Sequence, residues 1–298
     1  MNSIEKALQK QSQKAFDLNK EELQKPFESE QNTQQSSVEK ALQKQTTLSK
    51  GNNVTSTIQI DFEMLEKKGF VSTNSQRQLI NEEFRAIKRK LLDNAFGPLS
   101  KSLKNSNIIM VTSSRPGEGK TFTAINLALS IALEKDKTVL LVDADVLRPN
   151  VMKTLELERK QGLMEYLLGE NQDISEVMYK TNLDNLRIIP AGQSHHLSTE
   201  LLASEKMFEA VEEFANRYTD RVVIVDTPPL LGINETAILA NLAGQALVVT
   251  EESKTKLVDI EEAVKQLNSE MAIGFVVNKS EKVNTKGLGY GYYYAGAN

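Results

Sequence analysis

Residues 113–121 read S-S-R-P-G-E-G-K-T and stand between an apolar run, 108–111, and a stretch with helical periodicity, 121–133. This order of strand, glycine-rich loop and helix predicts a phosphate-binding loop, because the loop amides and the positive end of the helix can face an anion. An ordinary glycine turn before a helix is the alternative. The predicted nucleotide-binding residues of this segment are Ser114, Arg115, Pro116, Gly117, Glu118, Gly119, Lys120, Thr121 and Phe122.

Within the loop, each residue type has a distinct task. Lys120 can reach the phosphates as a point charge, and the Thr121 hydroxyl can bind Mg²⁺. The glycines let the backbone curve around the anion where a Cβ would obstruct it. Ser114 replaces the first glycine of the usual G-x-x-x-x-G-K-[ST] pattern.

Two acidic segments support a nucleotide site. Residues 139–145 read V-L-L-V-D-A-D, and residues 222–229 read V-V-I-V-D-T-P-P. Side chains i and i+2 of a strand point to the same face, so Asp143 and Asp145 could converge on one Mg²⁺ ion and one nucleophile. Asp226 is expected to hold Mg²⁺ through water. A strand-terminal Asp is more often a cap or turn residue, but three of them beside a phosphate loop favour a metal and nucleotide site.

The hydrophobic pattern predicts an α/β fold. Near-continuous apolar strands that alternate with helices indicate a doubly wound, mainly parallel sheet with helices on both faces, here a P-loop NTPase. Ligands of such sheets bind at the carboxyl ends of the strands, where the loop, Asp143 and Asp226 all fall. The expected strands are 108–112, 138–143, 186–190, 222–226, 246–250 and 273–277, and the clearest helices are 122–133, 201–218 and 257–267.

The chain divides into three predicted parts. Residues 1–60 are rich in Gln, Ser, Lys and Glu, with too few apolar residues for a core, and are expected to be disordered. A short segment, 3–11, recurs at 37–45, either as two docking helices for a partner or as a duplicated linker. Residues 61–281 form the globular domain. Residues 282–298 are a flexible tail that contains Tyr290, Tyr292, Tyr293 and Tyr294.

The tyrosine-rich tail has two readings. Four of the seven tyrosines fall in the last nine residues, among glycines that make ordering costly. Alone, this composition is equally typical of a sticky aromatic tail or of a strand that completes a sheet edge. Beside a nucleotide site, a mobile cluster of tyrosine hydroxyls suggests a phosphoryl acceptor.

These segments resemble the bacterial protein-tyrosine kinases that control polysaccharide export. The resemblance runs from about residue 80 to the C-terminus. It rests on the S-S-R-P-G-E-G-K-T loop, on L-L-V-D-A-D, on V-I-V-D-T-P-P and on the tyrosine cluster. The family's acidic motif ends D-x-D-x-R, whereas here Leu147 occupies the arginine position and Arg148 follows. Segment 61–92 looks most like the exosortase-associated subgroup.

The resemblance implies an ATP- and Mg²⁺-dependent autokinase that phosphorylates its tail tyrosines in trans. It implies that Lys120, Asp143 and Asp145 are catalytic, with Asp145 as the base. It also implies that Thr121, Asp143 and Asp226 bind Mg²⁺. Asn278 could contact adenine, as in related ATPases, or could be a turn residue that ends a strand. The family forms a homo-oligomeric ring through a helix with E-x-x-R-x-x-R; here Glu82, Arg85 and Lys88 match, with lysine in the last place.

Composition limits the partners. A net charge of −4 with interspersed signs argues against nucleic acid, and the absence of cysteine excludes disulfides and thiolate catalysis. No run approaches the roughly 18 apolar residues of a membrane span. We therefore expect a cytoplasmic chain that is recruited to the inner face of the membrane by a separate membrane-spanning co-polymerase, its activator. A cognate tyrosine phosphatase is a further partner that the resemblance implies.

One other function fits much of the sequence. A regulatory ATPase of the septum- or partition-protein type uses the same loop to switch a dimer on and off a membrane or scaffold. That class favours a second loop lysine at the position of Arg115, and it requires no tyrosine tail. The tail and Arg115 therefore favour the kinase.

Overall fold

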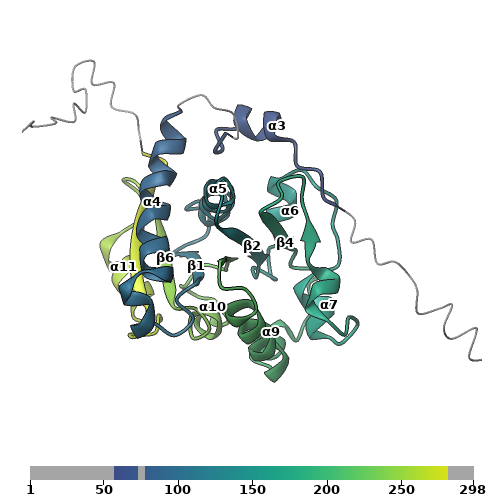
Figure 1. Ribbon diagram of the computed structural model, residues 1–298. Coiled ribbons are helices and arrows are strands. Elements are labelled where there is room, and N and C mark those ends of the chain that lie inside the picture. Colours follow the sequence, from purple (N-terminus) through teal and green to yellow (C-terminus); the bar gives the residue numbers. More distant parts are fainter. Residues whose placement is uncertain (1–56, 73–77, 281–298) are drawn as a thin grey trace, which may run out of the picture. The chain divides into compact units, whose positions relative to one another are not determined.

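The computed structural model describes residues 57–72 and 78–280. The duplicated N-terminal segment and the tyrosine tail therefore lie outside the described residues. The described chain forms a seven-stranded sheet in the order β3-β4-β2-β5-β1-β6-β7, with helices packed against it (Figure 1).

Six of the seven strands are parallel, as the sequence pattern predicts. The buried apolar runs of β1, β2, β4, β5 and β6 require cover on both faces, whereas β7 at the sheet edge is partly exposed. Only β3 runs antiparallel, opposite β4, and it was not predicted because two residues leave no pattern. The strands are β1 (Ile108–Ser113), β2 (Thr138–Asp143), β3 (Tyr179–Lys180), β4 (Leu186–Ile189), β5 (Arg221–Asp226), β6 (Gln245–Glu251) and β7 (Ala272–Asn278).

The helices fill the predicted gaps, with one correction. The pattern at 201–218 predicts one helix, but the structure has two, because the Ser204 hydroxyl accepts a hydrogen bond from the Met207 amide and caps a new helix. The helices are α3 (Phe62–Lys67), α4 (Leu79–Phe96), α5 (Lys120–Ala132), α6 (Val151–Thr154), α7 (Leu163–Leu167), α8 (Ser198–Leu202), α9 (Glu205–Asn216), α10 (Asn234–Ala240) and α11 (Leu257–Val264), with 3₁₀ turns at Pro98–Ser102 and Ile174–Val177.

Alternate residues of β1 enter separate apolar layers. Ile109 and Val111 pack with side chains from α3, α4, α5 and α6. Ile108 packs with α7, α8 and α9, and Met110 packs with α10 and α11. Strand β1 lies between β5 and β6, and its residue Val111 is paired with Asp226. This register brings the ends of β1 and β5 together at one edge of the sheet.

The folded domain starts slightly before the predicted boundary at residue 61. Ile58 and Ile60 are buried, and the Ile58 amide donates to the Lys180 carbonyl at 2.8 Å. Further along, the Val71 amide donates to Asn126 Oδ1 of α5 at 2.6 Å. Two apolar residues in a polar stretch were too weak a signal to predict that this segment packs into the core.

Candidate nucleotide site

The phosphate loop joins the end of β1 to the start of α5. Gly117 and Gly119 have φ values of 88° and 102°, in the left-handed region that favours glycine. A Cβ on Gly119 would lie 1.9 Å from Asn278 Nδ2, so no other residue fits there without movement. The first amides of α5 have no intrahelical partner and carry the positive end of the helix dipole. The predicted anion cradle is therefore formed by the backbone.

A cavity of about 810 Å³ opens over this loop. Its floor includes Lys120 and Thr121, one wall carries Asp145 and Arg148, and another carries Pro228. These residues follow β1, β2 and β5, so the cavity lies at the carboxyl edge of the sheet. The volume is within the range of small-molecule sites, about 300–1,000 Å³.

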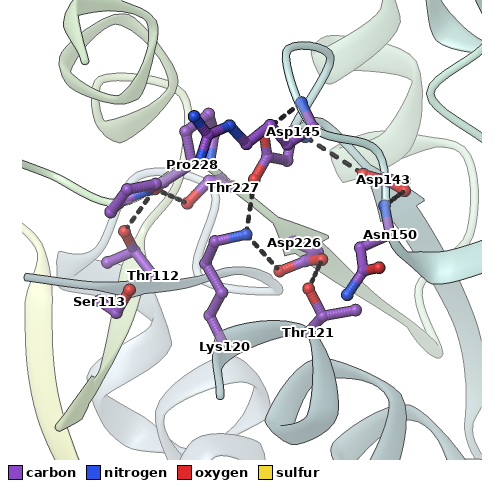
Figure 2. A network of polar contacts seen from close by, with 12 residues as sticks. Thr112, Ser113, Lys120, Thr121, Asp143, Asp145, Asn150, Asp226, Thr227 and Pro228 are labelled. Atoms are coloured by element: carbon purple, nitrogen blue, oxygen red, sulfur yellow. Dashed lines mark hydrogen bonds and ion pairs between the residues drawn. The ribbon is translucent and has the colours of Figure 1, made fainter. Parts of the chain in front are cut away.

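Lys120 lies between two carboxylates at the centre of the site. Its Nζ is 2.6 Å from Asp145 Oδ2 and 3.9 Å from Asp226 Oδ1 (Figure 2). Burial lowers the pKa of Lys120, but attraction by Asp226 and Asp145 outweighs it, so the pKa is raised above its ordinary value. Lys120 therefore stays a cation that is held ready for phosphate oxygens.

Asp226 offers a buried oxygen that suits a cation. Its Oδ2 accepts a hydrogen bond from the Thr121 hydroxyl at 2.7 Å, whereas Oδ1 is buried with no hydrogen-bond partner among the described residues. Burial raises the pKa of Asp226 to about 6. In the described part of the chain, no three His, Cys, Asp or Glu side chains are grouped to hold a metal. Mg²⁺ often takes only one or two carboxylates and completes its shell with phosphates and water, so Thr121 and Asp226 fit it.

Asp143 and Asp145 do not converge in the way that the strand pattern predicts. Strand β2 ends at Asp143, so Asp145 lies beyond the strand, where the i, i+2 rule no longer applies. Asp143 Oδ2 accepts the amides of Asn150 and Val151 at 3.1 and 3.0 Å, at the start of α6. Figure 2 shows Asp143 turned toward Asn150 while Asp145 faces Lys120.

The Asp143 carboxylate is directed toward Asn150 and not toward Lys120, which affects the role of Asp143. Its side chain is fully buried, and burial together with nearby Asp226 raises its pKa to about 8. Asp143 therefore supports the segment that carries Asp145, and its place as an Mg²⁺ ligand stays a prediction.

Residues of β7 and of the turn between β6 and α11 hold the outside of the loop. The Glu118 carboxylate accepts hydrogen bonds from the Arg115 amide and from the Thr255 hydroxyl. Asn278 Nδ2 donates to the Glu118 carbonyl at 2.9 Å. Thr255 could not be predicted as a loop contact, because it follows Glu118 by 137 residues.

The remaining predicted loop residues have different surroundings. The Arg115 guanidinium makes two hydrogen bonds to Asp259 of α11, at 2.6 and 2.9 Å. Ser114 is buried, and its hydroxyl has no hydrogen-bond partner among the described residues. Phe122 packs against Phe70, with ring centroids 4.7 Å apart. Phe70 also lines the cavity, which sequence reasoning missed.

The three residues predicted for an oligomer interface divide between the two faces of α4. Arg85 and Glu82 are half-exposed and form an ion pair at 2.6 Å. Lys88 is buried, where it donates to the Ser130 carbonyl at 2.7 Å and pairs with Glu134 at 2.5 Å. Lys88 thus joins α4 to α5 within the domain.

Comparisons with known proteins identify relatives of this chain. Residues 106–273 match a family described as AAA domain. The tyrosine-protein kinase YwqD from Bacillus subtilis is 31% identical over 230 residues, which are 76% of this chain and 92% of YwqD. The solved kinase domain of the Escherichia coli tyrosine kinase ETK superposes with a TM-score of 0.61 at 26% identity, covering 80% of this chain and 95% of that domain.

Some relatives are much longer. The tyrosine-protein kinase wzc from Salmonella typhimurium is 32% identical over 190 residues, which are 63% of this chain and 26% of wzc. The chain thus spans about a quarter of the length of wzc, and likewise of EpsB from Ralstonia solanacearum. In the described part of the chain, every helix is too short or too polar to cross a membrane.

Proposed function

The chain belongs to the family of bacterial tyrosine-protein kinases built on an AAA domain, and from this we propose that it transfers the γ-phosphoryl group of ATP to tyrosine hydroxyls. The observation that carries the proposal is the Lys120–Asp145 ion pair of 2.6 Å inside the cavity, beside the Thr121–Asp226 hydrogen bond. Together these groups supply a phosphate-binding cation, a cation-binding carboxylate and a candidate base.

Lys120 would change partners when ATP binds. Its ammonium is held by Asp145, whose other oxygen accepts the Arg148 amide at 3.0 Å. Phosphate oxygens compete for the same ammonium, and the loop amides add donors that Asp145 cannot use. ATP would therefore draw Lys120 away and leave Asp145 Oδ2 free to accept a proton.

The free carboxylate suits a tyrosine substrate. A tyrosine hydroxyl has a pKa of about 10, so a base is needed as it attacks. The tyrosine oxygen forms a bond to the γ-phosphorus, the bond from that phosphorus to the bridging oxygen breaks, and ADP leaves with the electron pair. The hydroxyl proton passes to Asp145. Lys120 and the loop amides stabilise the charge on the phosphoryl group.

Mg²⁺ would be held by the Thr121 hydroxyl and Asp226, and when bound it would neutralise phosphate charge. The base of ATP would occupy the side near Asn278. A second cavity of about 890 Å³ there is lined by Phe122, Thr123 and Asn278. These residues supply a ring, a hydroxyl and an amide that suit a purine.

The acceptors in this proposal are Tyr290, Tyr292, Tyr293 and Tyr294 of a neighbouring copy. Strand β7 ends at Asn278 beside the loop, so a tail that entered its own site would have to reverse sharply. Transfer in trans within a closed ring avoids that reversal, and head-to-tail contacts close such a ring. Exposed Glu82 and Arg85 on α4 are available for the contact.

The biological role in this proposal is control of exopolysaccharide or capsule synthesis and export. The support is the resemblance of the loop, acidic and tail motifs to the kinases of these systems. A separate membrane-spanning co-polymerase would activate the chain and hold it at the inner face of the membrane, and a cognate phosphatase would reverse the reaction. Cell fractionation with and without the co-polymerase tests this recruitment, and a distribution that never changes would contradict it.

The catalytic proposal is tested with purified protein, labelled ATP and Mg²⁺. Wild-type protein should acquire phosphotyrosine, and Lys120→Met should lose it, because Lys120 binds the phosphates. The two proteins are compared at a temperature at which both are folded, since the change also removes the cation from buried carboxylates. Lys135→Met, in the exposed turn after α5, is the matched control and should keep full activity. Phosphate release without phosphotyrosine would favour the regulatory ATPase instead, and full labelling of Lys120→Met would exclude this loop as the active site.

A further inference from the structure

Two consecutive carbonyls of the phosphate loop are held by side chains from the end of β7. The Lys279 ammonium donates to the Gly117 carbonyl at 2.7 Å. Asn278 Nδ2 donates to the next carbonyl, that of Glu118, at 2.9 Å. Both carbonyls therefore point toward β7 and accept protein donors there.

The direction of these carbonyls matters for binding an anion. In a trans peptide unit, the C=O of one residue and the N–H of the next residue point in opposite directions. A carbonyl that is held outward therefore leaves the N–H of the next residue facing inward. If the unit between Gly117 and Glu118 rotated, the negative end of its dipole would face the phosphates. Gly117 and Gly119 rotate more easily than other residues, because no Cβ restricts them. A glycine-rich loop thus needs outside contacts to keep one orientation.

Lys279 is placed for this contact by its own backbone and by an acidic neighbour. Its φ of 58° is uncommon for a residue other than glycine and brings its side chain back toward the loop. Its ammonium also pairs with Glu251 Oε2 at 2.9 Å, at the end of β6. Lys254 binds the other oxygen of Glu251, but within the described residues its ammonium forms no ion pair or hydrogen bond with the loop.

We propose that Lys279 is a positioning residue for the nucleotide: it fixes the Gly117 carbonyl outward and so keeps the loop amides turned toward the phosphates. This inference rests on the proposed nucleotide-binding function. Lys279 contacts the backbone of the loop, so it would act through that backbone. Its side chain is 47% exposed, and exposed ion pairs of this kind contribute little to folding stability. Its removal should therefore affect ligand binding far more than unfolding.

The two lysines around Glu251 provide a matched pair of variants. Lys279→Met keeps the side-chain length and removes the donor, whereas Lys254→Met removes an equal charge from the same carboxylate. We expect Lys279→Met to bind Mg·ADP about tenfold more weakly by calorimetry, which corresponds to one charge-assisted hydrogen bond. Lys254→Met should stay within about twofold of wild type, and Lys279→Arg, which restores a donor, should recover most of the affinity.

A second probe separates a loop effect from contact with the base, since Lys279 also borders the second cavity. Pyrophosphate has no base, so its competition with ADP reports the loop alone. Lys279→Met should weaken pyrophosphate and ADP by the same factor, and KM for ATP should rise with kcat little changed, the pattern of lost ground-state binding.

The outcomes distinguish the two proposals. If the wild-type protein binds neither ADP nor pyrophosphate, the proposed nucleotide site is wrong. If the wild type binds both and Lys279→Met binds them equally well, the positioning role alone is overturned. Equal losses in Lys254→Met and Lys279→Met, or a loss for ADP but not for pyrophosphate, would also overturn it. A loss in Lys279→Met that matches a lower unfolding temperature and is not recovered by Lys279→Arg would assign Lys279 a structural role instead.

Discussion

Two carboxylates that follow different strands share the ammonium of Lys120, and this sharing defines the centre of the site. The ammonium lies 2.6 Å from Asp145 and 3.9 Å from Asp226. A buried pair is strongly coupled, so removal of one partner leaves an uncompensated charge. Lys120→Met therefore has a second effect besides loss of phosphate binding: it leaves three nearby aspartates without their cation.

The buried aspartates predict a particular pH dependence of stability. The folded chain keeps protons on Asp226 and Asp143 up to about pH 6 and pH 8, whereas the unfolded chain releases them at about pH 4. Between these limits the folded state binds more protons, so in Mg²⁺-free buffer the free energy of unfolding should fall as pH rises from 5 to 8. Carboxylates with a lowered pKa, such as Asp259, act in the opposite sense but only below this window.

Denaturant unfolding at several pH values checks this prediction. Asp143→Asn keeps an oxygen for the amides of Asn150 and Val151 but cannot titrate, so its stability should change less between pH 6 and pH 8. A free energy of unfolding that increases over pH 5–8, or an equal slope in wild type and Asp143→Asn, would contradict the assignment.

At the level of residues, the sequence predicted which side chains meet when each belongs to a local motif. Lys120 and Thr121 sit at the helix start, and Asp226 ends an apolar strand, so their meeting follows from the topology of a parallel sheet. The prediction was incomplete where a side chain stabilises another part of the fold. Asp143 caps a helix start, and buried Lys88 joins two helices; a lysine and an aspartate carry no sign of this in the sequence.

At the scale of elements, strands were easier to predict than helix boundaries. A fully buried parallel strand is a continuous apolar run, and every such run lies in the sheet. Helical periodicity continues across a break when both helices pack on the same layer, which is why α8 and α9 looked like one helix. Ser204, a favoured N-cap residue, was the local signal that could have divided them.

Helix α4 carries the prediction that concerns assembly. Its inward face includes Phe84 and Leu91, which leaves the Glu82–Arg85 pair outside. If this pair contacts a neighbouring copy, Arg85→Ala should give monomers that autophosphorylate weakly, because the acceptor tail comes from the neighbour. Its unfolding temperature should hardly change, since an exposed i, i+3 pair contributes about 0.5 kcal/mol or less.

Size-exclusion chromatography with light scattering measures this directly. Arg217→Ala is the matched control, because Arg217 forms a similar half-exposed ion pair with Glu213 on α9. Arg217→Ala should keep the wild-type mass and activity. A fully active Arg85→Ala monomer would rule out transfer in trans, and an unchanged oligomer would remove α4 from the interface.

At the level of the whole molecule, the same sequence contains both the site and its proposed substrate. In the proposed reaction, the site of one copy acts on the tail of a neighbouring copy. The cavity lies at the carboxyl edge of the sheet, and β7 ends at that same edge. Each phosphotyrosine adds about −1.5 to −2 charges. A phosphorylated tail would be repelled by Asp145 and Asp226, so transfer should release the tail rather than trap it.

In the proposed reaction, the Lys120 site of one copy phosphorylates the C-terminal tyrosines of a neighbouring copy. Mass-spectrometric mapping after incubation with Mg·ATP tests it most directly, on the wild type and on a variant with Tyr290, Tyr292, Tyr293 and Tyr294 all changed to Phe. We expect phosphotyrosine within residues 290–294 of the wild type and its loss in the Phe variant, which should still bind Mg·ADP. Phosphotyrosine confined to other positions, or equal incorporation in the two proteins, would contradict it.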